Sequence, residues 1–310
     1  MLSIFPDYYH KFRCTASRCL HNCCIGWEID IDENTASFYN SVSGDMGKRL
    51  RESIASEDDV SHFILKEGER CPFLNSQNLC DIIISLGEEH LCTICREHPR
   101  FHNQLPGRVE SGLGMCCEEA ARLILSETSP VEFLTEGTAE CEDEIVALRD
   151  EVIKKLQDRS KTIDERIGDM LTACDASLPE RTCSQWADFL SGLERLQDSW
   201  TDMLTLLNDK GDTADLAAFD AHMQNRQTEY EQLLIYIVYR HMANAPDFDE
   251  VAPRVAFAAL CYRLLHTLGA VIYNEKGDFT FEQQLGLCRM LSSEIEYSDE
   301  NLYALLTELY

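Results

Sequence analysis

The chain has 310 residues, long enough for two hydrophobic cores, because single domains most often contain about 100 to 150 residues. Its formal net charge of −28 argues against a nucleic-acid partner, since binding to phosphates requires a basic surface. Its apolar runs are shorter than the about 20 residues that cross a bilayer, and MLSIFPDYYHKF does not resemble a signal peptide. We therefore expect a soluble, cytoplasmic protein that binds no membrane.

The first third of the chain is irregular and rich in cysteine, with short apolar segments between prolines and glycines. Residues 62–65 and 71–74 have the composition of strands, and we predict that they pair across KEGER as a small hairpin. Residues 82–86 predict a short helix that ends at Gly87, because glycine commonly follows the last turn of a helix.

The second part of the chain has the three- and four-residue apolar spacing of amphipathic helices. Residues 184–208 are predicted to form one long helix. Further helices are predicted at 225–243, 251–273, 282–292 and 299–310. The predicted fold class is mainly α. An irregular, cysteine-rich, metal-binding head with a small hairpin (1–125) is expected to pack on an acidic, all-helical body (126–310).

The acidic side chains are most abundant in this predicted body. Residues 1–120 carry 11 basic and 19 acidic side chains, whereas residues 121–310 carry 16 and 36. Such a surface either keeps the protein soluble or attracts a lysine-bearing protein partner, since a negative field steers cations toward it. Charge alone does not distinguish these two roles.

Cysteine is concentrated near the N-terminus, where ten of the fifteen cysteines lie in residues 1–117. Because structural disulfides are rare in reducing compartments, dense cysteine spacing favours a metal or redox centre. Closed zinc sites and iron–sulfur clusters both use four thiolates, so the residues alone leave both kinds of metal open. The other five cysteines are predicted to be ordinary core residues: Cys141, Cys174, Cys183, Cys261 and Cys288.

Four segments resemble the flagellin lysine N-methylase (FliB-type) family: FRCTASRCLHNCCIGWEIDID, CPFLNSQNLCDIIISLGEEHLCTICREHPR, CCEEAARLIL and YRHM. The resemblance is strongest over residues 5–125, and this part is also similar to a broader family of zinc- or iron-chelating domains. It implies methyl transfer from S-adenosylmethionine to flagellin lysines by a protein that carries a [4Fe–4S] cluster, with zinc as the alternative metal. Nine cysteines fall on the family's cysteine positions and are candidate metal ligands: Cys14, Cys19, Cys23, Cys24, Cys71, Cys80, Cys92, Cys95 and Cys117.

Two common signatures of S-adenosylmethionine enzymes are absent from the sequence. The glycines Gly112 and Gly114 are not completed to Gly-x-Gly-x-x-Gly, because position 117 is cysteine, so a Rossmann-type methyltransferase is disfavoured. The spacing Cys-x-x-x-Cys-x-x-Cys of most radical enzymes is also incomplete, because Gly26 stands at its third position. These departures favour polar methyl transfer, while the surplus of thiols leaves a radical route open.

Candidate site residues follow from the chemistry that the resemblance implies. A lysine amine has an ordinary pKa of about 10.4, so polar methyl transfer requires a base or a pocket that keeps it neutral. The candidate bases and amine-orienting groups are Glu28, Glu97, Glu119, Tyr239 and His241. An arginine fork suits the carboxylate of S-adenosylmethionine and an aromatic ring suits adenine, so the candidate cofactor-binding residues are Trp27, Arg96, Arg100 and Arg240.

Each of these residues also has an ordinary structural explanation, as a solvated charge, a core aromatic or a group placed against a helix dipole. The first function that we expect is an S-adenosylmethionine-dependent protein-lysine N-methyltransferase with a flagellin-type substrate. The alternative is a non-enzymatic iron–sulfur or zinc-binding module for protein interaction or redox sensing.

Overall fold

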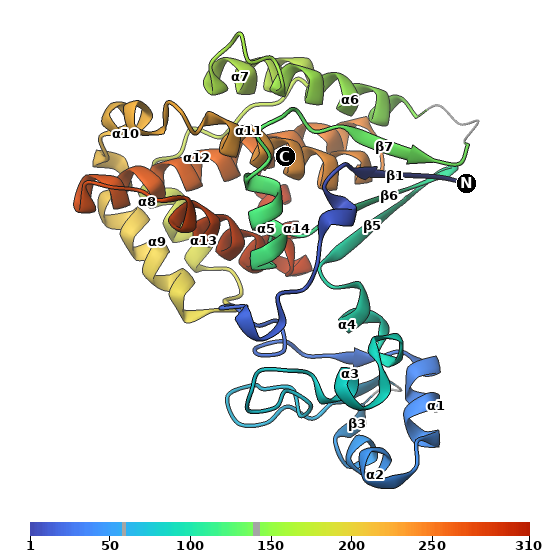
Figure 1. Ribbon diagram of the computed structural model, residues 1–310. Coiled ribbons are helices and arrows are strands. Elements are labelled where there is room, and N and C mark those ends of the chain that lie inside the picture. Colours follow the sequence, from blue (N-terminus) through green and yellow to red (C-terminus); the bar gives the residue numbers. More distant parts are fainter. Residues whose placement is uncertain (58–59, 139–142) are drawn as a thin grey trace. The chain divides into compact units, whose positions relative to one another are not determined.

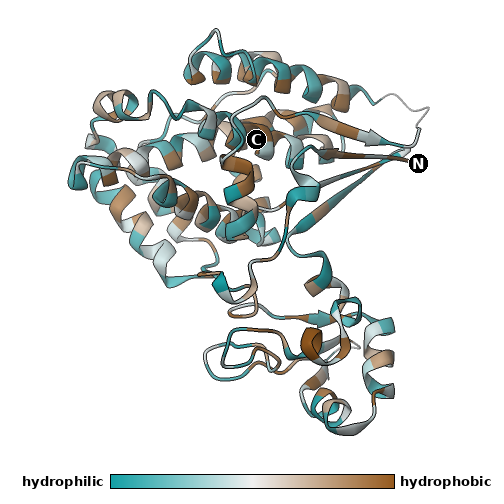
Figure 2. Cartoon of the chain, viewed as in Figure 1, coloured by the Kyte–Doolittle hydropathy of each residue, from teal (hydrophilic) through white to brown (hydrophobic). Residues whose placement is uncertain are grey.

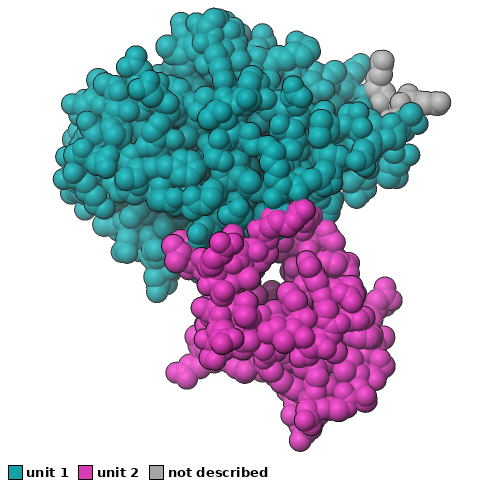
Figure 3. Space-filling view, in the orientation of Figure 1, with its two compact units in different colours: residues 1–12, 102–310 teal, residues 13–101 magenta. Residues whose placement is uncertain are grey.

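A computed structural model describes residues 1–57, 60–138 and 143–310, and the chain forms two compact units. The cysteine-rich unit contains residues 13–101, and the helical unit contains residues 1–12 and 102–310 (Figure 3). The chain therefore begins in the helical unit, passes through the cysteine-rich unit and returns. As a result, the residues predicted for the head (1–125) are divided between the two units.

The described part of the cysteine-rich unit contains short helices and a three-stranded sheet with the strand order β2-β4-β3 (Figure 1). Helix α3 is largely apolar (Figure 2), and its residue Ile82 is buried in the core of the unit. The elements are α1 (Glu33–Ser41), α2 (Gly44–Glu52), α3 (Asp81–Leu86), α4 (Thr93–Glu97), β2 (Asp30–Ile31), β3 (Ile54–Glu57) and β4 (Val60–Phe63).

The predicted helix at 82–86 is confirmed as α3, and Gly87 follows it with a φ of +103° that favours glycine. The predicted hairpin is wrong. Strand β4 pairs with β2 and β3, and an isolated bridge joins Lys66 to Arg70, while residues 71–74 form a buried turn. A short apolar run is compatible with either a strand or a core loop, and in this chain residues 71–74 are buried, with Leu74 bridged to Cys80 rather than to β4.

The helical unit combines a four-stranded sheet with long helices, of which α11 and α12 pack side by side (Figure 1). Its strands are β1 (Leu2–Pro6), β5 (Arg100–Leu105), β6 (Arg108–Leu113) and β7 (Phe133–Glu136), with β5 starting just before the unit boundary. Its helices are α5 (Glu118–Leu125), α6 (Glu144–Leu156), α7 (Ile163–Ala173), α8 (Cys183–Ser191), α9 (Asp198–Lys210), α10 (Leu216–Met223), α11 (Gln227–His241), α12 (Val251–Lys276), α13 (Phe281–Leu291) and α14 (Asp299–Glu308).

The mainly helical fold class is confirmed, but the body is not all-helical. The sheet has the order β5-β6-β1-β7, and its strand β7 lies inside the predicted body. The N-terminal strand β1 pairs in parallel with β6 and antiparallel with β7. Because these partners are more than 100 residues apart along the chain, local patterns could not predict the sheet.

The predicted helices at 225–243, 251–273, 282–292 and 299–310 are confirmed as α11, α12, α13 and α14. Capping boxes at Thr162, Thr182 and Thr280 start α7, α8 and α13, because each threonine and its third following residue satisfy each other's backbone amides. Helix α12, with three preceding residues, is apolar and long enough to cross a membrane, yet 89% of its most apolar window is buried inside the protein.

The long helix predicted at 184–208 is wrong, because the chain breaks into α8 and α9 between residues 191 and 198. Two side chains from the C-terminal region bind the backbone amides of this break. The amide of Glu194 donates to Asn301 Oδ1 at 2.9 Å, and the amide of Leu196 donates to Glu294 Oε2 at 2.9 Å. These bonds replace helical hydrogen bonds, so the break leaves these donors satisfied.

Candidate functional site

Five of the nine candidate metal ligands belong to the hydrophobic core of the cysteine-rich unit. Cys71 and Cys92 are buried in this core, and Cys24, Cys80 and Cys95 pack against it as partly buried residues. We call these five residues the thiol core. They come from three separate segments of the chain, so the fold gathers sulfur atoms that the sequence spreads over about 70 residues.

Backbone contacts bring these segments together. The amide of Cys71 donates to the carbonyl of Cys24 at 2.9 Å, and an isolated bridge joins Leu74 to Cys80. Cys92 is the residue that precedes α4, and Cys95 lies one turn later in the same helix. Residues three apart on a helix lie on the same side, so this spacing places the two thiols next to each other.

The thiols of the core interact with one another. The hydrogen bond between Cys92 and Cys95 lowers the pKa of Cys92 and raises the pKa of Cys95. A hydrogen bond with Cys23, together with burial, raises the pKa of Cys24, and burial raises the pKa of Cys71 to about 12. Most of these thiols are therefore neutral in the protein alone, whereas a bound metal stabilises thiolates.

The other candidate ligands lie outside this core. Cys14 and Cys23 are exposed, and Cys19 is half-buried. The Cys14 sulfur accepts a weak hydrogen bond from the amide of Ala16 at 3.4 Å. Cys117 precedes the first residue of α5 in the helical unit.

Five cysteine sulfurs lie in one core, and thiolates are ligands that bind zinc and iron–sulfur clusters. Within residues 1–57, 60–138 and 143–310, however, no three His, Cys, Asp or Glu side chains form a group that could hold a metal ion. The prediction of ordinary core positions is confirmed for Cys183, Cys261 and Cys288, which are buried. Cys174 is half-buried, and Cys141 lies outside the described residues.

Several predicted cofactor-binding residues lie near one another in the cysteine-rich unit. The ring centroids of Trp27 and His98 are 6.4 Å apart, and burial lowers the pKa of His98 to about 4. Arg96 Nε lies 3.3 Å from Glu97 Oε1, and Arg100 donates to the Arg96 carbonyl at 3.5 Å. The fold thus brings Trp27 to the segment that carries both arginines.

Two of the predicted bases, Glu28 and Glu119, are exposed or partly exposed rather than buried. Glu28, next to Trp27 in the chain, is exposed. Glu119 lies in the first turn of α5, 3.8 Å from Arg122 Nε, and Arg122 also donates to Glu282 at 2.8 Å. Glu119 therefore belongs to a surface ion-pair network in the helical unit.

A second group of ionisable side chains is buried inside the helical unit. A π-helical turn, Ser292–Glu296, follows α13 and carries the buried Glu296. Glu296 accepts a hydrogen bond from Tyr236 Oη at 2.9 Å and lies 2.6 Å from His241 Nε2 and 3.5 Å from Arg240 Nη1. Together with Tyr297, whose ring lies 4.6 Å from the Arg240 guanidinium, these residues form what we call the Glu296 cluster.

Electrostatics keep Glu296 charged although it is buried. Burial by itself raises the pKa of this carboxyl, but Arg240 and the hydrogen bond from His241 outweigh it and lower the pKa to about 2. Burial lowers the pKa of His241, so the imidazole is neutral and donates its proton to Glu296. The cluster is therefore a buried Arg–Glu ion pair with a neutral histidine beside it.

The Glu296 cluster also fixes the turn that precedes α5. The amide of Met115 donates to Tyr236 Oη at 3.1 Å. A Cβ atom at Gly114 would lie only 1.9 Å from Tyr297 Oη, so a side chain at this position would clash with the cluster. Arg240 and His241 were identified from the sequence but Glu296 was not, and it lies between the helices predicted at 282–292 and 299–310.

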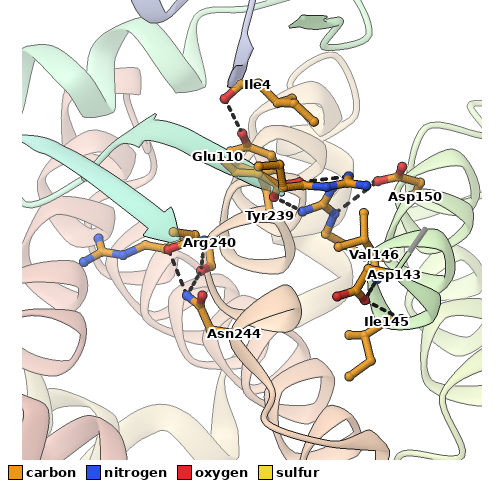
Figure 4. A network of polar contacts seen from close by, with 12 residues as sticks. Ile4, Glu110, Asp143, Ile145, Val146, Asp150, Tyr239, Arg240 and Asn244 are labelled. Carbon is orange, nitrogen blue, oxygen red and sulfur yellow. Dashed lines mark hydrogen bonds and ion pairs between the residues drawn. The ribbon is translucent and has the colours of Figure 1, made fainter. Parts of the chain in front are cut away.

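Tyr239 lies apart from this cluster and joins α11 to the sheet (Figure 4). Its hydroxyl donates to the carbonyl of Ile4 at 3.1 Å and lies 3.3 Å from the carbonyl of Ser111. The guanidinium of Arg149 lies 5.1 Å from the Tyr239 ring and forms a buried ion pair with Glu110. These contacts hold β1, β6, α6 and α11 together.

We expect the substitution Tyr239→Phe to lower the free energy of unfolding by about 1 to 2 kcal/mol, because a buried carbonyl loses its donor. Urea denaturation of the wild type and the variant measures this difference. An unchanged midpoint would show that the bonds from Tyr239 to Ile4 and Ser111 make no net contribution to stability.

Comparison with known proteins places the chain in a protein family. The family model described as "FliB lysine N-methylase C-terminal domain" matches residues 113–310. Because this match covers more than half of the chain, the chain belongs to the FliB lysine N-methylase family. The matched region contains Arg240, His241 and Glu296, whereas the resemblance over residues 5–125 stays a prediction.

Curated relatives are similar over a shorter region. The chain is 27% identical over 132 residues to proteins named "Lysine-N-methylase" from Salmonella typhimurium and Salmonella choleraesuis, covering 39% of this chain and 32% of each relative. It is equally similar to "Flagellar biosynthetic protein FliU" from Salmonella muenchen, over 76% of that protein. The match thus spans about a third of the first two relatives. No solved structure is significantly similar to the chain.

Proposed function

We propose that this protein is an S-adenosylmethionine-dependent protein-lysine N-methyltransferase that acts on a flagellin-type substrate. The observation that carries the proposal is the family match over residues 113–310, together with relatives named for lysine methylation and flagellar biosynthesis. The acidic character of the chain supports a lysine-bearing protein as the partner, because a net charge of −28 attracts cationic surfaces.

The thiol core is the proposed position of a [4Fe–4S] cluster, with zinc as the alternative metal. Five sulfur donors from three segments share one hydrophobic core, and four thiolates suffice for either group. When bound, the cluster supplies a redox-capable iron centre and cross-links the irregular segments of the unit. Cys24, Cys71, Cys80, Cys92 and Cys95 are the residues that would hold it.

S-adenosylmethionine binding is proposed for the segment around Trp27, Arg96 and Arg100. The contact between Trp27 and His98 brings an aromatic ring to the two arginines, which suit adenine and a carboxylate. Glu28, exposed next to Trp27, is the proposed group that orients the lysine amine. Arg240 is already paired with Glu296, so it would have to leave this partner to bind a cofactor.

We propose the polar route for methyl transfer. The neutral amine nitrogen forms a bond to the methyl carbon while the bond between sulfur and that carbon breaks. Its electron pair stays on sulfur and gives S-adenosylhomocysteine. The nitrogen then loses a proton to a carboxylate or water. A dry pocket favours this step, because desolvation keeps the lysine amine neutral.

An anaerobic assay with flagellin and S-adenosylmethionine, with and without a strong reductant, tests this proposal. We expect methyl-lysine and S-adenosylhomocysteine in both conditions. If methylation requires the reductant and 5′-deoxyadenosine forms in proportion to methyl-lysine, the transfer is radical and the polar route is wrong. No methylation in either condition, with an intact metal centre, would favour the non-enzymatic binding module.

A further inference from the structure

We propose that a groove in the cysteine-rich unit binds an extended, lysine-bearing segment of the protein substrate; this inference rests on the proposed function. The groove has a volume of about 750 Å³ and is open to solvent. Its walls come from β2, one side of α1, the start of β4 and the start of α4. We call it the acidic groove.

The groove combines carboxylates with apolar surface. Asp30 and Glu33 are exposed at its edge, and neither forms an ion pair with another described residue. Ala36 and Ile94 line it, and Ile94 is 50% exposed. A lysine side chain has an apolar stem and a cationic head, so it requires both kinds of surface together. No lysine or arginine is among the described residues that line the groove.

A third carboxylate holds the groove in shape. Asp32 accepts hydrogen bonds from the amide of Thr35 in α1 at 3.1 Å and from the amide of Thr93 in α4 at 2.9 Å. Asp32 therefore joins the N-terminal ends of α1 and α4, which both line the groove. Because its oxygens are already used, Asp30 and Glu33 are the carboxylates left to receive an ammonium group.

The same two helices separate the groove from the thiol core. Thr93 and Ile94 line the groove, and the thiol-core residues Cys92 and Cys95 flank them in the chain. In α1, Tyr39 is fully buried in the core and donates to the carbonyl of His90 at 2.8 Å. A segment bound in the groove thus lies one helix away from the thiol core.

The double substitution Asp30→Asn with Glu33→Gln tests the groove in the full-length protein. The probe is a fluorescent peptide from flagellin that contains lysine, and its binding is measured by anisotropy. We expect the dissociation constant to rise about tenfold, which corresponds to about 1.4 kcal/mol. The matched control is Glu52→Gln with Glu67→Gln, which removes two exposed charges of the same unit outside the groove.

Methylation kinetics provide the second readout. We expect the groove variant to raise KM for the peptide with kcat nearly unchanged, and the control to behave as the wild type. Equal peptide affinity in wild type and groove variant would overturn the groove proposal, even if methylation is observed. Groove-dependent peptide binding without any methylation would instead support the groove and contradict the proposed function.

Discussion

The substitution Glu296→Gln is expected to lower the free energy of unfolding by about 3 to 5 kcal/mol, because it leaves a buried arginine without its counterion. Arg240 is 11% exposed, and its carboxylate partner Glu296 is 1% exposed. Glutamine keeps the size of the side chain but removes the charge that Arg240 and His241 contact. Urea denaturation followed by far-ultraviolet circular dichroism measures the loss.

The matched control for this experiment is Glu300→Gln, in the exposed first turn of α14. Surface substitutions of this kind change the free energy of unfolding by about 0.5 kcal/mol or less. A Glu296→Gln protein as stable as the control variant would contradict the assignment of Glu296 as the buried counterion of Arg240.

The same cluster makes stability dependent on pH. The pKa of Glu296 is about 2 in the folded protein, against an ordinary value of 4.5, so the unfolded chain binds its proton first on acidification. The resulting stabilisation, about 3 kcal/mol, is complete above the ordinary pKa and is lost as the pH falls toward 2. His241 acts in the same direction below its ordinary pKa, since burial lowers its pKa in the folded state.

Unfolding curves of wild type and Glu296→Gln between pH 4.5 and 2 measure this contribution. We expect the stability of the wild type to fall more steeply on acidification than that of the variant. Parallel curves would show that Glu296 titrates alike in the folded and unfolded states.

The substitution Cys95→Ser is expected to remove most of the bound iron and sulfide and the broad visible absorption of an iron–sulfur protein. Cys95 lies in the thiol core and is hydrogen-bonded to Cys92, so the substitution breaks up a pair of donors that the fold already holds together. The exposed Cys14 lies outside this core, and Cys14→Ser is expected to keep its iron and colour. Anaerobic purification followed by iron and sulfide analysis compares the two variants with the wild type.

The helical unit provides an internal control for folding. Its core, centred on α11 and α12, contains no residue of the thiol core. The Cys95→Ser protein should therefore keep most of its helical circular dichroism. Full iron content in Cys95→Ser, or loss of iron in Cys14→Ser, would show that the ligands are a different set of cysteines.

The helices of the second half could be predicted because their apolar residues recur with helical spacing over 10 or more residues, as in α12 and α14. The break between α8 and α9 could not, since Asn301 and Glu294 bind its amides from about 100 residues away. The four-stranded sheet could not be predicted for the same reason, since β1 pairs with β6 and β7, which are distant along the chain.

The residues of the candidate site could also be predicted only in part. Cysteine spacing and the family resemblance identified nine candidate ligands, but only the fold separates the thiol core from exposed Cys14 and Cys23. Glu296 was missed because it lies between two predicted helices, where an acidic residue is normally solvated. Its burial depends on the π-helical turn and on α11, which the local sequence does not reveal.

The most direct test of the central claim is the mass spectrum of flagellin after anaerobic incubation with S-adenosylmethionine and either the wild type or Cys95→Ser. We expect methyl-lysine with the wild-type protein and little or none with Cys95→Ser, although the variant keeps its helical circular dichroism. Equal methylation by both proteins would contradict a role for the thiol core in methyl transfer, and no methylation by the wild type with its iron–sulfur cluster intact would contradict the proposed activity itself.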